Sequence, residues 1–149
     1  MWSSDMAVQI CSYSRHHIDF QIQNTEGKSC RCTGVYRHPQ ASQKKHTWTL
    51  LRRLAGLFSL PWLCFGNFNE ILNLNGKTGG LNKSADVFNE FRDVVLDCKL
   101  FDLRSRGHPF TWSNRQFGPQ LIEEKLDRFL CNQEWRTIFH DDLATNLVH

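Results

Sequence analysis

The sequence has no long hydrophobic run, little glycine and proline, and a nearly even balance of charges. Its longest apolar stretch, residues 60–65, is six residues long and contains Pro61, whereas a membrane-spanning helix needs about 20. Glycine and proline together supply 13 of 149 residues, too few for a collagen-like repeat or a low-complexity linker. The first five residues, Met-Trp-Ser-Ser-Asp, have neither the basic segment nor the apolar segment of a secretory signal. These absences predict one globular domain over residues 1–149, with no membrane partner, in the cytosol or the nucleus.

Cysteine is scattered rather than paired. The six cysteines are Cys11, Cys30, Cys32, Cys64, Cys98 and Cys131. Cys30 and Cys32 would share one face of a strand, but no second Cys or His pair follows them at the spacing of a zinc site. Without an oxidising compartment such cysteines are most often small buried apolar groups. The sequence therefore predicts no disulfide framework and no metal site.

Common catalytic and nucleotide-binding motifs are also missing. Gly76-Lys77-Thr78 matches the end of a phosphate-binding loop, but Ile71 stands where that loop requires glycine. No H-E-x-x-H or G-x-S-x-G motif occurs. His16 and His17 are adjacent, so on a strand they would point to opposite faces. We expect no small-molecule cofactor.

The positive charge is concentrated in the first part of the chain. The net charge is +3, but residues 1–60 carry eight basic and three acidic groups, against ten and twelve in residues 61–149. A basic region of this kind can contact a phosphate backbone. The simpler interpretation, a solvated surface with excess Lys and Arg, is favoured.

The hydrophobic pattern predicts strands with helices between them, which indicates a mixed α/β domain. Residues 60–65 form a continuous apolar run that predicts a strand buried on both faces. The other expected strands are residues 7–13, 18–23, 31–36, 101–103, 110–112 and 125–130, and the expected helices are residues 42–58, 84–98 and 132–139.

The most informative segment follows the apolar strand. Asn67 and Asn69 alternate about Phe68, so both side chains can point one way at the end of the strand. Ligands bind at strand ends in open α/β sheets. The two carboxamides and Glu70 could position a polar substrate there, although Asn also suits turns.

Residues 66–71, Gly-Asn-Phe-Asn-Glu-Ile, resemble the Gly-Asp-Phe-Asn-Glu-Ile signature of the endonuclease/exonuclease/phosphatase superfamily. More narrowly, the chain resembles the endonuclease-like region of plant LINE-type retroelement proteins. Five further segments match in order and spacing: residues 13–19, 33–36, 48–54, 109–114 and 125–130.

The resemblance implies a four-layer sandwich, with two β-sheets face to face and helices outside. It also implies Mg²⁺-dependent cleavage of phosphodiester bonds, in which the metal neutralises charge on the phosphorane. On this view Tyr36 matches the tyrosine that approaches the scissile phosphate, and Asn69 matches the asparagine that orients phosphate or water. Asp127 matches the aspartate that holds the catalytic histidine. Asn67 stands where the family has its catalytic aspartate.

The resemblance further leads us to expect an incomplete sandwich, lacking N- and C-terminal parts of the family fold. The family's metal-binding glutamate would lie before Met1, and its Ser-Asp-His motif after His149. Uncovered sheet edges would then favour self-association. The Mg²⁺ of the family is accordingly not expected to bind here.

Three functions follow from the sequence. The first, favoured, is a degenerate endonuclease-like protein with little or no catalysis. The second is an interaction module for nucleic acid or protein, with Trp112 and Arg115 near the former site and phosphate contacts from Lys44, Lys45, Arg52 and Arg53. Against this, Trp112 as a core residue is the favoured interpretation. The third is an active metal-dependent nuclease or phosphatase with Glu70 as a metal ligand.

Overall fold

The computed structural model describes residues 6–36, 40, 43–68, 72, 76–80, 85–103, 105–139 and 144–146. Within these residues the main element is a six-stranded sheet of order β1-β2-β3-β4-β10-β6. Its strands are β1 (Met6–Tyr13), β2 (His17–Asn24), β3 (Ser29–Tyr36), β4 (Trp62–Asn67), β10 (Asp127–Cys131) and β6 (Phe101–Asp102). Neighbouring strands are antiparallel, except that β3 and β4 run parallel.

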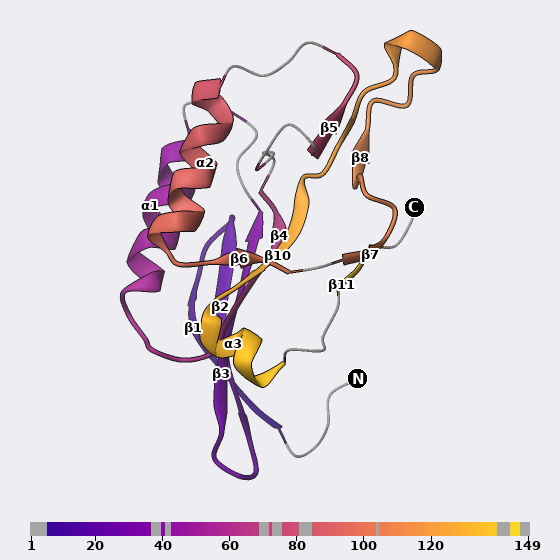
Figure 1. The fold of residues 1–149 in the computed structure, drawn as a ribbon. Coiled ribbons are helices and arrows are strands. Elements are labelled where there is room, and N and C mark those ends of the chain that lie inside the picture. Colours follow the sequence, from indigo (N-terminus) through magenta and orange to yellow (C-terminus); the bar gives the residue numbers. More distant parts are fainter. Residues whose placement is uncertain are drawn as a thin grey trace.

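Two helices, α1 (Lys44–Ala55) and α2 (Ala85–Asp97), lie side by side against one face of this sheet (Figure 1). The short helix α3 (Gln133–Ile138) follows β10 and begins at Asn132, whose side chain accepts a hydrogen bond from the Trp135 backbone N–H. These elements confirm the sequence predictions, with small shifts at their ends. The helix expected over residues 42–58 is shorter: it ends at Ala55, with Gly56 as its C-cap, and Leu57 beyond it is exposed.

Five further short elements were not predicted, whereas a sixth, β8 (Trp112–Ser113), overlaps the strand expected over residues 110–112. Two- and three-residue strands form two small sheets: β5 (Lys77–Thr78), β9 (Glu123–Glu124) and β8 in one, and β11 (Ala144–Asn146) with β7 (Ser105–Gly107) in the other. A 3₁₀ turn, η3 (Gly118–Gln120), lies between β8 and β9. Strands this short cannot show an alternating pattern in a sequence.

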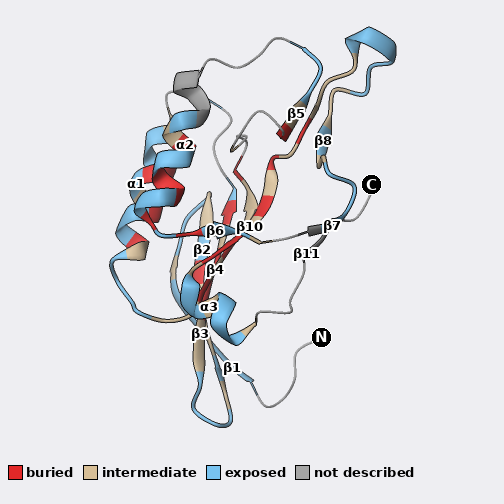
Figure 2. Cartoon of the chain, in the orientation of Figure 1, coloured by how far each residue is buried: buried red, intermediate tan, exposed pale blue. Residues whose placement is uncertain are grey.

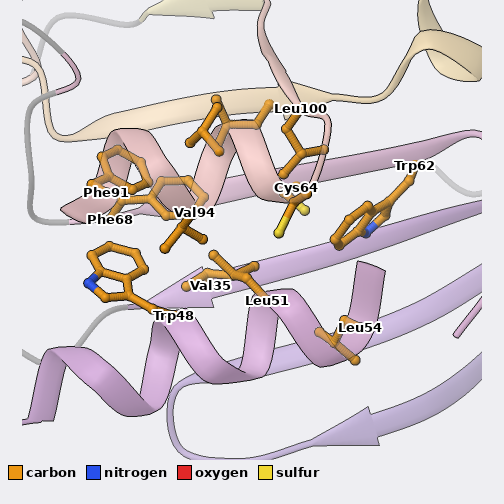
Figure 3. Packing of buried hydrophobic residues seen from close by; sticks show 13 residues of the cluster. Val35, Trp48, Leu51, Leu54, Trp62, Cys64, Phe68, Phe91, Val94 and Leu100 are labelled. Carbon is orange, nitrogen blue, oxygen red and sulfur yellow. The ribbon is translucent and has the colours of Figure 1, made fainter. Parts of the chain in front are cut away.

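The hydrophobic core lies between the helices and the sheet (Figures 2 and 3). Phe91 of α2 stacks on Trp48 of α1 at 5.0 Å between ring centroids and on Phe68 at 5.3 Å. Val35 and Cys64 close the cluster from the sheet (Figure 3). No helix in the described part of the chain is long and apolar enough to span a bilayer.

A buried ion pair lies beside this core. Arg31 donates two hydrogen bonds of 2.9 Å to the Asp19 carboxylate, and both side chains are 1% exposed. Thr33 donates a third bond to Asp19 at 2.6 Å and accepts one from the Trp62 indole. The remaining Arg31 nitrogen donates to the Leu54 carbonyl. Every polar group of the pair is therefore satisfied, as a buried pair requires.

The opposite face of the sheet is less covered. On β4, Trp62 and Cys64 are buried, but Leu63 and Phe65 on the other face are only half-buried. The prediction of a strand buried on both faces is therefore wrong for one face, because the short helix α3 is the described helix that contacts it, with Arg136 over the Phe101 ring at 4.7 Å. On the same face β1 exposes Met6, Val8 and Ile10 (Figure 2).

Candidate functional site

Three of the predicted site residues lie in one row at the end of the sheet. Tyr36 is paired with Asn67, and Asn67 is paired in turn with Asp127, so β4 lies in the middle. Residues paired in this way present their side chains on the same face, with neighbouring strands about 4.8 Å apart. The row therefore spans about 10 Å. A phosphate group lying over its middle can form hydrogen bonds with the side chains at both ends of the row.

The three side chains differ in exposure. Tyr36 is 61% exposed, so its hydroxyl is open to a ligand. Asn67 is half-buried, and its side-chain oxygen is fully buried without a hydrogen-bond partner among the described residues. A buried acceptor left without a partner costs free energy, so this carboxamide is a group that a ligand, water or ion would satisfy.

The backbone around Asn67 is fixed by Gly66. This glycine has a φ of +130°, and a Cβ built there would come within 2.0 Å of the Val35 carbonyl oxygen. Only glycine allows β4 to approach β3 this closely while keeping the conformation. The glycine of the signature is thus needed for the alignment of Asn67 with Tyr36.

Asp127 is fixed from the other side. The hydroxyl of Thr111 accepts hydrogen bonds of 3.0 Å from the backbone N–H groups of Leu126 and Asp127. Thr111 itself donates its backbone N–H to the Glu124 carbonyl. The segment before β8 therefore sets the start of β10, and with it the position of the Asp127 carboxylate.

Trp112 and Arg115 lie on this same segment rather than in the row. Trp112 is in β8, one residue beyond Thr111, and is 44% exposed. The interpretation of Trp112 as a core residue is therefore wrong. Arg115 is exposed and has a φ of +58° in the turn after β8.

The structure describes some of the other predicted residues and not others. Asn69 and Glu70 lie outside the described residues. Arg52 donates to Asp97 of α2 at 2.9 Å, which makes it part of a contact between helices rather than a solvated cation. Its neighbour Arg53 is exposed.

Sequence reasoning missed the turn between β1 and β2, which lies beside Tyr36. The His17 ring is within hydrogen-bond distance of the hydroxyls of Ser12 (3.0 Å) and Ser14 (2.7 Å). His16 contacts the Tyr36 carbonyl through Nδ1, at 3.1 Å. Burial lowers the pKa of His17 despite the nearby Asp19, with Arg53 adding to the effect. His17 is thus held neutral near pH 7.

The described residues do not form a complete metal centre. They contain no cluster of three or more His, Cys, Asp or Glu side chains able to hold an ion. At the sheet end, Asp127 supplies one carboxylate and Asn67 one carboxamide oxygen, which are ligand types that Mg²⁺ accepts. These two groups alone do not make a Mg²⁺ site.

A large sheet covered by two long helices on one face, with polar residues aligned at its end, is a mixed α+β fold. Solved structures show that this fold is consistent with the endonuclease/exonuclease/phosphatase type. The endonuclease domain of TRAS1, a telomere-specific non-LTR retrotransposon, superposes with a TM-score of 0.63 at 14% identity, over 89% of this chain and 58% of that one. No protein-family model and no curated protein matches the chain.

Two further structures agree. TDP2 of D. rerio, complexed with a single strand DNA product, gives a TM-score of 0.51 at 13% identity, over 87% of this chain and 54% of that one. An endonuclease/exonuclease/phosphatase family protein from Leptotrichia buccalis gives 0.50 at 16% identity, over 88% and 50%. The chain thus spans only half to three-fifths of these structures, and the similarity concerns the fold.

Proposed function

We propose that this chain is a nuclease-like module that binds nucleic acid and cleaves phosphodiester bonds slowly or not at all. The observation that carries the proposal is the position of Asn67, in register between Tyr36 and Asp127. This is where the resembled family has a catalytic aspartate. The fold similarity to nucleases supports the substrate class.

The chemistry of the row favours binding over cleavage. The Tyr36 hydroxyl and the Asn67 amide nitrogen are hydrogen-bond donors suited to phosphate oxygens. A carboxamide carries no charge and cannot accept a proton from an attacking water. Loss of one general acid–base group typically lowers a rate about 10²–10⁴-fold. In the row itself Asp127 is the remaining carboxylate.

The proposal extends to origin and partners. A retroelement origin is supported by the sequence resemblance and by the likeness to the TRAS1 endonuclease domain. Self-association is supported by the exposed apolar side chains of β1 and β2. The exposure of Trp112 and Arg115 supports a role for these two residues in contacting nucleic acid.

The test is Mg²⁺-dependent nicking of supercoiled DNA by this chain and by Asn67→Asp, each with a chelator control. We expect Asn67→Asp to cut about 10²–10⁴ times faster, because it regains a basic carboxylate. Asn67→Ala serves as the matched control, since it removes the amide without adding charge. Robust cutting by the unmodified chain would contradict the proposal. If neither protein cuts, Asn67 is not what limits cleavage.

A further inference from the structure

A cavity of about 460 Å³ lies between the β1–β2 turn and helix α1. Its size falls within the usual range of small-ligand pockets. It does not include Tyr36, Asn67 or Asp127. Its principal polar lining consists of Ser14, His16, His17, His46, Thr49 and Arg53.

One face of α1 forms the wall of this cavity. His46, Leu50 and Arg53 all line it and recur at spacings of four and three residues, which places them on the same side of a helix. This face is directed at the turn that carries His16 and His17. Two separate elements therefore converge on one hollow.

The charge of the lining suits an anion. None of the lining residues is acidic and Arg53 is a permanent cation, so the lining carries positive charge even with His17 neutral. Asp19, the carboxylate whose charge acts on His17, is 1% exposed and bonded to Arg31 and Thr33. It therefore offers little repulsion to an anion in the cavity.

The two neighbouring arginines of α1 differ in their partners. Arg52 is bonded to Asp97 at 2.9 Å. Arg53 makes no ion pair with any carboxylate in the described part of the chain, and it faces the cavity. The guanidinium of Arg53 is thus the one available for a phosphate, which it can contact through paired N–H groups.

A second hollow connects this cavity to the candidate site. It has a volume of about 360 Å³, shares Ser14, His16 and His17 with the first, and reaches Tyr36 and Gly66. We propose that the cavity beside Arg53 binds a phosphate group of a nucleic acid strand, which flanks the phosphate bound at Tyr36. This inference rests on the proposed function, and it adds a binding site on the far side of the β1–β2 turn.

The test compares Arg53→Gln with Arg52→Gln in binding a fluorescein-labelled single-stranded DNA 12-mer, measured by fluorescence anisotropy from 20 to 200 mM salt. Both side chains are substantially exposed, so both variants should fold, which thermal unfolding checks. We expect Arg53→Gln to weaken binding about 3–10-fold at low salt and to lower the salt slope by roughly 0.7, the value for one phosphate contact on a single strand. Arg52→Gln should change binding by less than about twofold.

Equal effects of the two substitutions, or none, would overturn the inference. Inorganic phosphate as a competitor separates the two sources of the anion. Inorganic phosphate is added at the same concentration of phosphate groups as the 12-mer provides. If it displaces the 12-mer fully, and this displacement requires Arg53, the cavity is a free-phosphate site and the nucleic acid assignment is wrong. The binding result is independent of the nicking test. If binding depends on Arg53 but Asn67→Asp does not cut DNA, only the catalytic part of the proposed function is wrong.

Discussion

The two faces of the six-stranded sheet are built from alternate residues of the same strands, yet they are stabilised in different ways. The face under α1 and α2 holds the Asp19–Arg31 pair and the stacked Trp48 and Phe91. The other face is also largely apolar, with rows such as Ile18, Gly34, Phe65 and Phe129. On β1 and β2 its side chains nevertheless stay partly exposed, with Ile18 and Ile10 at 41% and 58%, although Cys32 and Cys131 on the same face are buried. Apolar composition makes a face suitable for burial, but a packed helix layer is what buries it.

The candidate site and the cavity beside Arg53 lie on different faces of the sheet. The row of Tyr36, Asn67 and Asp127 is the last row of the less covered face. The cavity beside Arg53 lies on the helix side, across the β1–β2 turn. The polar row of one face and the cavity on the other side therefore lie at the same end of the sheet.

The largest expected difference between the faces is in the cost of removing an aromatic ring. Phe91→Ala should lower the free energy of unfolding by roughly 3–5 kcal/mol, because Phe91 is fully buried between Trp48 and Phe68. Phe65→Ala on the other face should cost about half as much or less, since Phe65 is only half-buried. Urea unfolding of both variants measures the difference. Equal losses would mean that the two faces are packed alike.

The next effect concerns the charged pair of the covered face. Arg31→Met should destabilise the protein by about 3 kcal/mol, because it leaves the Asp19 carboxylate buried without a cation. We expect the lower end of the usual range, since the Thr33 hydroxyl still donates to Asp19. Thermal and urea unfolding measure the loss.

The matched control for the buried pair is Lys28→Ala. This substitution removes an exposed ion pair with Glu26 at 3.8 Å, and exposed pairs contribute about 0–1 kcal/mol. If Arg31→Met lowers the free energy of unfolding as little as Lys28→Ala does, the buried pair stabilises the protein no more than an exposed pair.

The sequence predicted the long elements of the fold well for a physical reason. Strands of six to eight residues and helices of twelve or thirteen are long enough to show their periods, as in residues 18–23 and 84–98. The ion pair was not foreseen, because Asp19 and Arg31 are twelve positions apart and meet only through the pairing of β2 with β3. The burial of β4 was overstated, because its apolar run shows suitability for burial on both faces but not what packs there.

The candidate site was predicted in part. Tyr36, Asn67 and Asp127 were named from a motif resemblance, and the register brings them together. The β1–β2 turn was dismissed because neighbouring histidines on a strand point apart. The strand expected over residues 18–23 already left both histidines outside it, so that argument did not apply to them. In the structure β2 begins at His17, His16 lies in the turn, and both residues line the same cavities. The sequence could not show that α1 lies across a cavity from this turn.

The smallest expected effect on folding is at the outer edge of the less covered face. Ile10→Lys should change the free energy of unfolding by less than about 0.5 kcal/mol, because Ile10 is mainly exposed. It should, however, lower self-association. The six strands present roughly 600 Å² of sheet per copy, close to the area that each partner buries in a stable interface, about 800 Å². A second copy is therefore the partner we expect, since this face is almost free of charge on β1, β2 and β3.

Sedimentation velocity over a range of protein concentrations tests the association, with Lys28→Ala as the control away from this surface. A second measurement is the rate of alkylation of Cys30, which is paired with Ile22 beside Val8 on this face. The neighbouring Cys32 thiol lowers the pKa of Cys30, which raises the thiolate fraction of Cys30 and with it the rate of alkylation wherever reagent can reach it. Covering by a second copy should slow this reaction as the protein concentration rises, and Ile10→Lys should remove that dependence. A monomer at all concentrations, with a constant alkylation rate, would mean that an uncharged, partly exposed sheet face does not suffice for association.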